Sequence, residues 1–423
     1  MSSSLTDIFI AIPAMDEPGL ADNLLALNQQ TLKPRAVVVC VNQPEAYYHD
    51  GDAGHLRICA CNKTVFEQVA ELQKQGKFGF EVVLIDCFSP GKAWDEKHIG
   101  VGWARRTALD VAAQLAETAA PRLAETAAPL LVCMDADTLY PDSYLQDLQR
   151  QFEAHPQAVA IANPYYHPLP DDLPEKHAVA LLHYECYMRA YALQMMRTHH
   201  PYAFTAVGSS MACTLTAYRR IGGISPFKSG EDFYFLQKLR KTGALLRHSE
   251  SVSHPSCRLS TRVFFGTGPA LNKGLKNNWV SYPFYPLSLF EKMRDAYAAL
   301  PRLFESGMPE PALDLWEEAF GKDWWKKMRA NAGGCPQQFI RACTEKFDAL
   351  RSLQFLKSSY AQNPESDWEN LSELCNNFIE TRWKDRNLHS LSDLTLSDWK
   401  TLRHDLFLCE RHLQQNQPLL PAF

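Results

Sequence analysis

Residues 130–144 read LLVCMDADTLYPDSY, and the fold depends on how the hydrophobic start of this stretch meets its acidic middle. The first five residues form an apolar run with the length of a buried strand. Asp135 and Asp137 follow at once, and a turn is predicted at Tyr140-Pro141. Aspartates are common where strands stop, because their side chains hydrogen-bond turn backbone. Two carboxylates at a strand end can equally bind a divalent cation, so both interpretations stay open at this point.

Strand and helix patterns alternate over the first 130 residues. Short apolar segments predict strands at Ile8–Pro13, Ala36–Val41 and Phe80–Asp86, and a helical pattern starting at Ile99 leads toward the strand that begins at Leu130. Alternation of this kind predicts a Rossmann-like α/β sheet. The pattern continues with a strand at 157–164 and helices at 177–197 and 233–242.

The character of the chain changes near residue 283. Strand signals end there, and amphipathic segments follow one another at 287–300, 311–330, 336–357, 366–385 and 395–414. We therefore expect two domains: an α/β domain over residues 1–282 and an all-α region over residues 283–423.

Composition excludes some classes of function. The chain has 423 residues, 46% of them hydrophobic, which is ordinary for a globular protein. Its formal net charge of −5 gives no basic surface for nucleic acid, so no nucleic-acid partner is expected. No window approaches the length of a transmembrane helix, and the first residues lack a signal-peptide pattern. Twelve scattered cysteines fit a reducing compartment, and a cytoplasmic location is expected.

Three further clusters of polar residues stand where a strand gives way to a loop or helix, the edge where open α/β sheets bind ligands. The segment IPAMDEP begins with the last two residues of the first predicted strand. Glu231 and Asp232 open a predicted helix, although acids in a first helical turn also stabilise the helix dipole. His254 is followed by Arg258 and Arg262. Taken singly, each cluster has an ordinary structural explanation.

Their order along the chain resembles glycosyltransferase family 2. The similar segments are IPAMDE, NLLALNQQTLKPRAVVVCVNQ, GVGWARRTALD, VCMDADTLYPDSYL, SSMACTLTAYRRIGGISPFKSGEDFYFLQKLRKTG and SHPSCRLSTR, and together they cover about residues 6–265. The resemblance implies a GT-A fold, a Rossmann-like mixed sheet flanked by helices. It also implies transfer of a sugar from a nucleoside-diphosphate-sugar donor, with inversion at the anomeric carbon.

The resemblance assigns roles to residues of this chain. It implies that Asp135, Asp137 and His254 bind Mn²⁺ or Mg²⁺, which stabilises the leaving diphosphate. It implies that Asp232 is the general base and that Glu231 orients it or binds the acceptor. The residues that it implies for donor binding are Pro13, Asp16, Glu17, Asn42, Arg105, Asp135, Arg258 and Arg262.

Several positions depart from the family pattern. Asp16 stands where Asn is usual, Asn42-Gln43 stands where an Asp often contacts uridine, and Arg106 replaces a common Asn. The nucleotide base therefore stays open. So does the acceptor, which the resemblance allows to be a glycan, a lipid-linked sugar or a small molecule, with peripheral membrane association left open.

Three other functions fit the sequence less well. A sugar-nucleotide pyrophosphorylase normally has a Gly-rich loop after its first strand, and IPAMDEPG offers a single Gly. A non-catalytic scaffold on a transferase fold is disfavoured because Asp135, Asp137, Glu231, Asp232 and His254 are all present. An oxidoreductase is weaker still, since GVGWAR lacks the third Gly of a dinucleotide-binding fingerprint.

Overall fold

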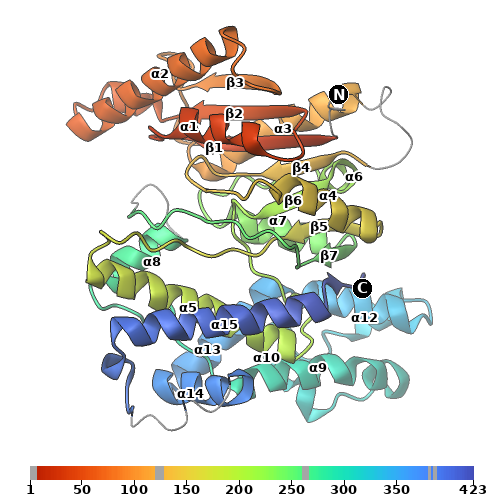
Figure 1. Ribbon diagram of the computed structural model, residues 1–423. Coiled ribbons are helices and arrows are strands. Elements are labelled where there is room, and N and C mark those ends of the chain that lie inside the picture. The colour runs from red at the N-terminus through yellow and green to blue at the C-terminus, as the bar shows by residue number, and fades with distance from the viewer. Residues whose placement is uncertain (1–6, 120–127, 260–265, 380–382, 384–387) are drawn as a thin grey trace. The chain divides into compact units, whose positions relative to one another are not determined.

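The computed structural model describes residues 7–119, 128–259, 266–379, 383 and 388–423 (Figure 1). The chain forms two compact units, and each combines separate stretches of sequence. The first unit contains Met1–Asp171 and Ala206–Asn272, and the second contains Asp172–Thr205 and Lys273–Phe423. The chain thus changes unit three times, whereas the predicted domain boundary at residues 282 and 283 stays a prediction.

A mixed β-sheet forms the centre of the first unit. Its strand order is β3-β2-β1-β4-β6-β5-β7, and β6 runs antiparallel to both of its neighbours. The strands are β1 (Ile8–Ala14), β2 (Ala36–Asn42), β3 (Glu81–Cys87), β4 (Leu130–Cys133), β5 (Ala158–Ala162), β6 (Met211–Thr214) and β7 (Ala244–Leu246). Strands were predicted at the places of β1 to β5, whereas β6 and β7 were not predicted, because segments of four and three residues give too little periodicity.

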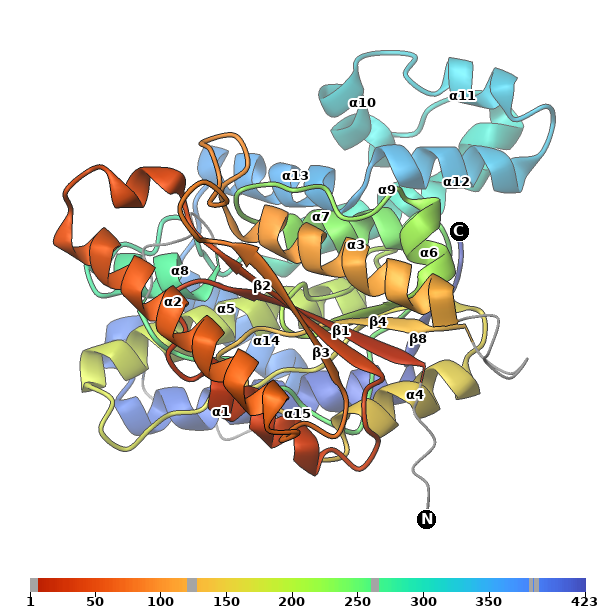
Figure 2. The same ribbon diagram turned by 90° about the horizontal axis from the view of Figure 1, so that it is seen from above.

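Helices accompany this sheet. They are α1 (Leu20–Ala26), α2 (Ala53–Lys74), α3 (Val101–Ala119), α4 (Tyr144–Ala154), α6 (Leu215–Arg220) and α7 (Glu231–Arg240), with short 3-10 turns η1 (Leu27–Gln29) and η2 (Glu45–Tyr48), and the chain leaves the unit within α8 (Thr267–Gly274). α3 packs on β1 and β2 (Figure 2). α7 packs on β5 and β7.

Small side chains bring α3 close to the sheet. Ala104, Ala108, Ala112 and Ala116 recur every four residues, which places them on one face of the helix, and none of them is exposed to solvent. The strand opposite is equally dry, since β2 is buried along its whole length. A Val-rich strand is typical of a parallel sheet that is covered on both faces.

The second unit is helical. Its helices are α5 (Glu175–Arg197), α9 (Leu287–Ser306), α10 (Asp314–Phe320), α11 (Lys326–Asn331), α12 (Pro336–Lys346), α13 (Ala349–Gln362), α14 (Asp367–Phe378) and α15 (Leu396–Asn416), with short turns η4 (Pro311–Leu313) and η5 (Leu391–Asp393) and a two-residue strand β8 (Leu419–Leu420). The expected GT-A-type architecture, a Rossmann-like mixed sheet flanked by helices with a helical C-terminal region, is confirmed.

Two helices distant in sequence pack side by side in the second unit. α5 lies along α15 (Figure 1), and Arg189 on α5 forms buried ion pairs with Glu185 on the same helix and with Glu410 on α15. Arg403 of α15 adds a contact of 3.4 Å to Glu185. Because a buried charge is costly when unpaired, this network requires α5 and α15 to align in one register.

The alanine face of α3 allows a test of the sheet packing. Ala112→Leu should lower the free energy of unfolding by about 1–3 kcal/mol, because extra methylene groups would overpack a fully buried contact. The measurement is urea denaturation of the purified variant. Gln114→Leu, on the exposed face of the same helix, is the matched control and should stay within about 0.5 kcal/mol of wild type. Equal losses in both variants would contradict the packing argument.

Candidate active site

The parallel strands β1, β2 and β4 deliver polar residues to one edge of the sheet. In the strand register, Ala14 lies beside Val41, and Cys133 lies beside Ala11. The segments that follow these strands are therefore neighbours, as expected for the carboxyl edge of a parallel sheet. This edge carries the segment IPAMDEP at the end of β1 and the pair Asp135 and Asp137 after β4.

Arg105 joins the two acidic pairs. Its Nη2 donates to Asp135 Oδ1 at 2.9 Å, its Nε donates to Glu231 Oε1 at 3.1 Å, and its Nη1 donates to the carbonyl oxygen of Gly208 at 3.0 Å. The Arg105 side chain is only 2% exposed. The resemblance implies donor binding by Arg105, whereas in the structure all three guanidinium nitrogens donate to protein acceptors.

The turn after Asp135 is held by an aromatic side chain. The backbone N–H of Asp135 donates to Tyr140 Oη at 3.3 Å, and Tyr140 Oη donates to the carbonyl oxygen of Ser209 at 2.9 Å. Asp135 is a third exposed, so its carboxylate stays open to solvent although Arg105 holds one of its oxygens. The Asp135 carboxylate is thus fixed in place and accessible.

Arg258 brings together two other predicted residues. Its Nε lies 2.9 Å from Asp137 Oδ2, and its Nη2 donates to Glu17 Oε1. Asp137 follows β4 and Glu17 follows β1, so the Arg258 guanidinium contacts the acidic residues that follow both strands. Arg262, the other arginine predicted to bind the donor, lies outside the described residues.

The remaining donor-side residues surround the ends of β1 and β2. Asp16 has a positive φ of 57° and a bidentate ion pair with Arg57, at 2.8 and 2.6 Å. Its backbone N–H donates to Asn62 Oδ1, and Asn62 Nδ2 donates to the carbonyl oxygen of Asn42. Asn42 is itself buried, while Pro13 of β1 is half-buried. The structure therefore gathers Asp16 and Asn42 into one polar network.

His254 lies beside the acidic turn. Its backbone forms a two-hydrogen-bond bridge with Leu139, two residues after Asp137. Its Nδ1 lies 2.9 Å from the carbonyl oxygen of Tyr166. A carbonyl oxygen can only accept, so Nδ1 carries the proton, and in the neutral ring Nε2 keeps a lone pair for a ligand. This orientation is typical of a histidine prepared to bind a metal.

Glu231 and Asp232 begin α7, directly after Gly230 in the left-handed conformation. Glu231 is buried, whereas Asp232 is partly exposed. Burial raises the pKa of Glu231 even though Arg105 opposes the shift. Loss of solvent, together with the adjacent Glu231 charge, raises the pKa of Asp232 to about 7. A carboxyl group with such a pKa can exchange a proton near neutral pH.

Comparison with known proteins gives a family. A model described as glycosyl transferase family group 2 matches residues 130–355, more than half of the chain, including both acidic pairs and His254. The chain belongs to glycosyl transferase family group 2. The predicted resemblance is confirmed, and membership implies a nucleotide-sugar donor.

Solved structures add only remote similarity to this family 2 member. A crystal structure of S. aureus TarS matches with a TM-score of 0.34 and 14% identity, over 84% of this chain and 55% of that one. This chain thus spans about half the length of TarS. A crystal structure titled as a mycobacterial protein matches with a TM-score of 0.27 and 12% identity, over 72% of this chain and 75% of that one. No curated protein matches the chain.

The candidate site offers oxygen and nitrogen ligands for a divalent cation. Within the described parts of the chain, no group of three or more His, Cys, Asp or Glu side chains forms a preassembled metal centre. The atoms that these residues offer as metal ligands nevertheless suit Mn²⁺ or Mg²⁺, since Asp135 and Asp137 have partly exposed carboxylates and His254 has Nε2. These cations need few protein ligands, because water and substrate phosphates fill the remaining positions.

Sequence reasoning missed several residues of the site. Arg57 and Asn62 both lie on α2, and neither belongs to a family motif. Tyr140 was seen only as part of a turn. Gly208 leaves room for Arg105, because a Cβ on it would lie 2.6 Å from Arg105 Nη2. The signal that could have found Tyr140 is its position five residues after Asp135; for the others the sequence shows none.

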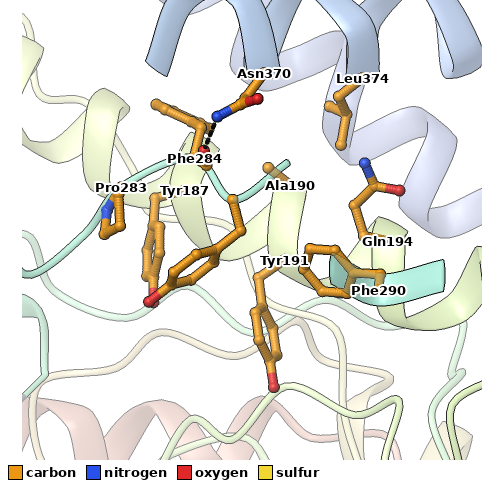
Figure 3. A pocket seen from close by; sticks show the side chains of 10 residues that line it. Tyr187, Ala190, Tyr191, Gln194, Pro283, Phe284, Phe290, Asn370 and Leu374 are labelled. Atoms are coloured by element: carbon orange, nitrogen blue, oxygen red, sulfur yellow. Dashed lines mark hydrogen bonds between the residues drawn. The ribbon is translucent and has the colours of Figure 1, made fainter. Parts of the chain in front are cut away.

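The second unit contains a small cavity, lined mainly by aromatic residues of α5 and of the 283–290 segment (Figure 3). Tyr187 and Tyr191 of α5 and Asn370 of α14 line it, and Asn370 Nδ2 donates to the carbonyl oxygen of Phe284. Its volume is about 10 Å³, which is room for roughly one water molecule and not for a sugar ring.

Of the helices that the structure describes, none is long and apolar enough to cross a membrane.

Close packing of α3 against the loop before α7 gives a test of how the site is built. A Cβ on Gly102 would lie 2.0 Å from the carbonyl oxygen of Phe227, so Gly102→Ala should destabilise the protein by about 1–3 kcal/mol. Chemical denaturation measures the loss. Gly79→Ala is the control, because its Cβ would meet its nearest neighbour at an ordinary 3.5 Å. A stable Gly102→Ala variant would show that the two segments can separate freely.

Proposed function

We propose that this family 2 enzyme transfers a glycosyl group from a nucleoside-diphosphate-sugar to an acceptor hydroxyl, with inversion, and that Asp232 is the general base. One observation supports the proposal: Arg105 pairs with both Asp135 and Glu231, so the acidic segment after β4 lies close to the acidic start of α7. A donor bound near Asp135 would then have its anomeric carbon within reach of an acceptor bound near Asp232.

The reaction needs a proton acceptor on one side and charge stabilisation on the other. As the acceptor oxygen bonds to the anomeric carbon, Asp232 takes the hydroxyl proton. The bond from that carbon to the diphosphate oxygen breaks, and the electron pair leaves with the diphosphate. Attack from the face opposite the leaving group inverts the carbon. Glu231, held by Arg105, would orient Asp232 or bind the acceptor.

The donor side is assigned to the polar residues that follow β1, β2 and β4. Pro13, Asp16 and Asn42 would contact the nucleoside, and Arg258 would pair with diphosphate oxygens once released from Asp137 and Glu17. Asp135, Asp137 and His254 would hold Mn²⁺ or Mg²⁺, which supplies Lewis-acid stabilisation of the leaving diphosphate. Here Arg258 neutralises Asp137, the carboxylate that the cation would bind.

Several classes of acceptor fit the proposed function. A glycan, a lipid-linked sugar and a small molecule all present the hydroxyl that Asp232 requires. We retain the expectations of a cytoplasmic location and of no nucleic-acid partner, with peripheral membrane association left to experiment. The non-catalytic scaffold is the competing function, and it differs in predicting no metal-dependent binding of a nucleotide sugar.

Ligand-induced stabilisation tests the donor side. Thermal denaturation with Mn²⁺ and a panel of nucleoside diphosphates and nucleotide sugars should show stabilisation by one base, of roughly 2.7 kcal/mol at a hundred times the dissociation constant. Asp137→Ala should lose this metal-dependent shift. Asp142→Ala, an exposed position on the same segment, should keep it. Absence of a shift with every nucleotide in wild type would favour the scaffold function.

The pH dependence of turnover tests the base. Asp232 must be ionised to accept a proton, and its pKa is about 7, so kcat should rise with pH and level off above neutrality. Below the pKa the rate should fall about tenfold per pH unit. Asp232→Asn should abolish turnover with donor binding nearly unchanged, whereas Asp295→Asn, an exposed control on α9, should behave as wild type. An Asp232→Asn variant with full turnover would rule out this base.

A further inference from the structure

Arg105 is buried at the meeting point of three segments that are remote in sequence. It lies on α3, its partner Asp135 follows β4, and its partner Glu231 opens α7, 126 residues further along the chain. The guanidinium nitrogens all donate within the protein, and the side chain is 2% exposed. A diphosphate could reach Arg105 only by displacing one of these carboxylates.

We propose that Arg105 is a positioning residue that fixes the Asp135 carboxylate and the Glu231 carboxylate at a set separation. The inference rests on the proposed function, in which Asp135 serves the donor and Glu231 serves the acceptor. Arg105 thereby sets the distance between the donor side and the acceptor side of the site. This assignment replaces the diphosphate contact expected for Arg105 from the sequence.

The geometry of arginine suits this role. The planar guanidinium presents donors in a rigid fork, so one side chain can hold two carboxylates in fixed directions, with the Gly208 carbonyl as a third anchor. A lysine at the same position has one charged nitrogen and no fixed fork. Lysine would therefore keep the positive charge between Asp135 and Glu231 without fixing their orientation.

The surroundings of Arg105 are shaped to keep it in place. Gly208 leaves no room for a Cβ beside Nη2, and the alanine face of α3 holds the helix against the sheet. Without Arg105, Glu231 would be a buried carboxylate with no cation beside it and with a second carboxylate at Asp232. Charge balance thus makes a specific prediction, namely that neutralising Glu231 compensates for loss of Arg105.

The first experiment uses thermal unfolding and needs no substrate. Arg105→Gln should lower the unfolding midpoint by several degrees, and adding Glu231→Gln to that variant should restore part of the loss. Arg106→Gln is the matched control, since Arg106 is the next residue on α3 but is partly exposed, and it should shift the midpoint little. If Glu231→Gln restores nothing in the Arg105→Gln background, the ion-pair link is overturned.

The second experiment separates positioning from folding. Steady-state kinetics of Arg105→Lys, on the nucleotide sugar that stabilises wild type most, should show kcat reduced about a hundredfold with KM for the donor nearly unchanged. The unfolding midpoint of Arg105→Lys should stay closer to wild type than that of Arg105→Gln. A raised KM with unchanged kcat would instead indicate direct donor contact and overturn the proposal.

The two experiments also distinguish the proposal from the function on which it rests. Failure of wild type to bind any nucleotide sugar contradicts the proposed function, whereas the unfolding cycle can still be measured. Compensation by Glu231→Gln in a protein without nucleotide binding would leave Arg105 a structural residue only, and would overturn its positioning role.

Discussion

The buried guanidinium of Arg105 is the interaction on which the site depends. It brings the acidic turn after β4 and the start of α7 to one place, although neither segment is near the other in the sequence. Burial makes the contact demanding, because a charge removed from water must be compensated by its partners. The partly exposed Asp135 carboxylate and the buried Glu231 carboxylate together neutralise the Arg105 charge. The carboxylates that neutralise Arg105 are thus the ones to which the proposed function assigns chemical roles.

Small residues make that arrangement possible by letting the segments approach closely. The alanine face of α3, the close approach at Gly102 and the space at Gly208 each remove a side chain where two segments must nearly touch. The segment packed against each of these alanines and glycines requires a small residue there. Their role is therefore in packing and not in contact with a substrate. The precision of the site thus derives from packing as much as from the charged groups.

The sequence predicted the parts of the fold that have strong periodicity. β1 and β2 are hydrophobic along their length, and the acids that follow β4 sit at a strand end, so their location could be inferred from local pattern. The short strand β6 gave no such signal. Partners remote in sequence were also invisible: nothing in the composition of α3 indicates that Arg105 faces Glu231, or that Arg57 faces Asp16. These pairings arise only when the topology of the sheet is complete.

The pairing of α5 with α15 has a consequence for synthesis. α5 is made between β5 and β6, yet the partner of Arg189 on α15, Glu410, follows 221 residues later. At ordinary rates of translation this interval lasts roughly 10 to 45 s. During that time Arg189 can pair with Glu185 on its own helix, but the face of α5 that packs against α15 has no partner and stays hydrated or is shielded by other factors. The helices of the second unit can therefore close around α5 only after α15 has been synthesised.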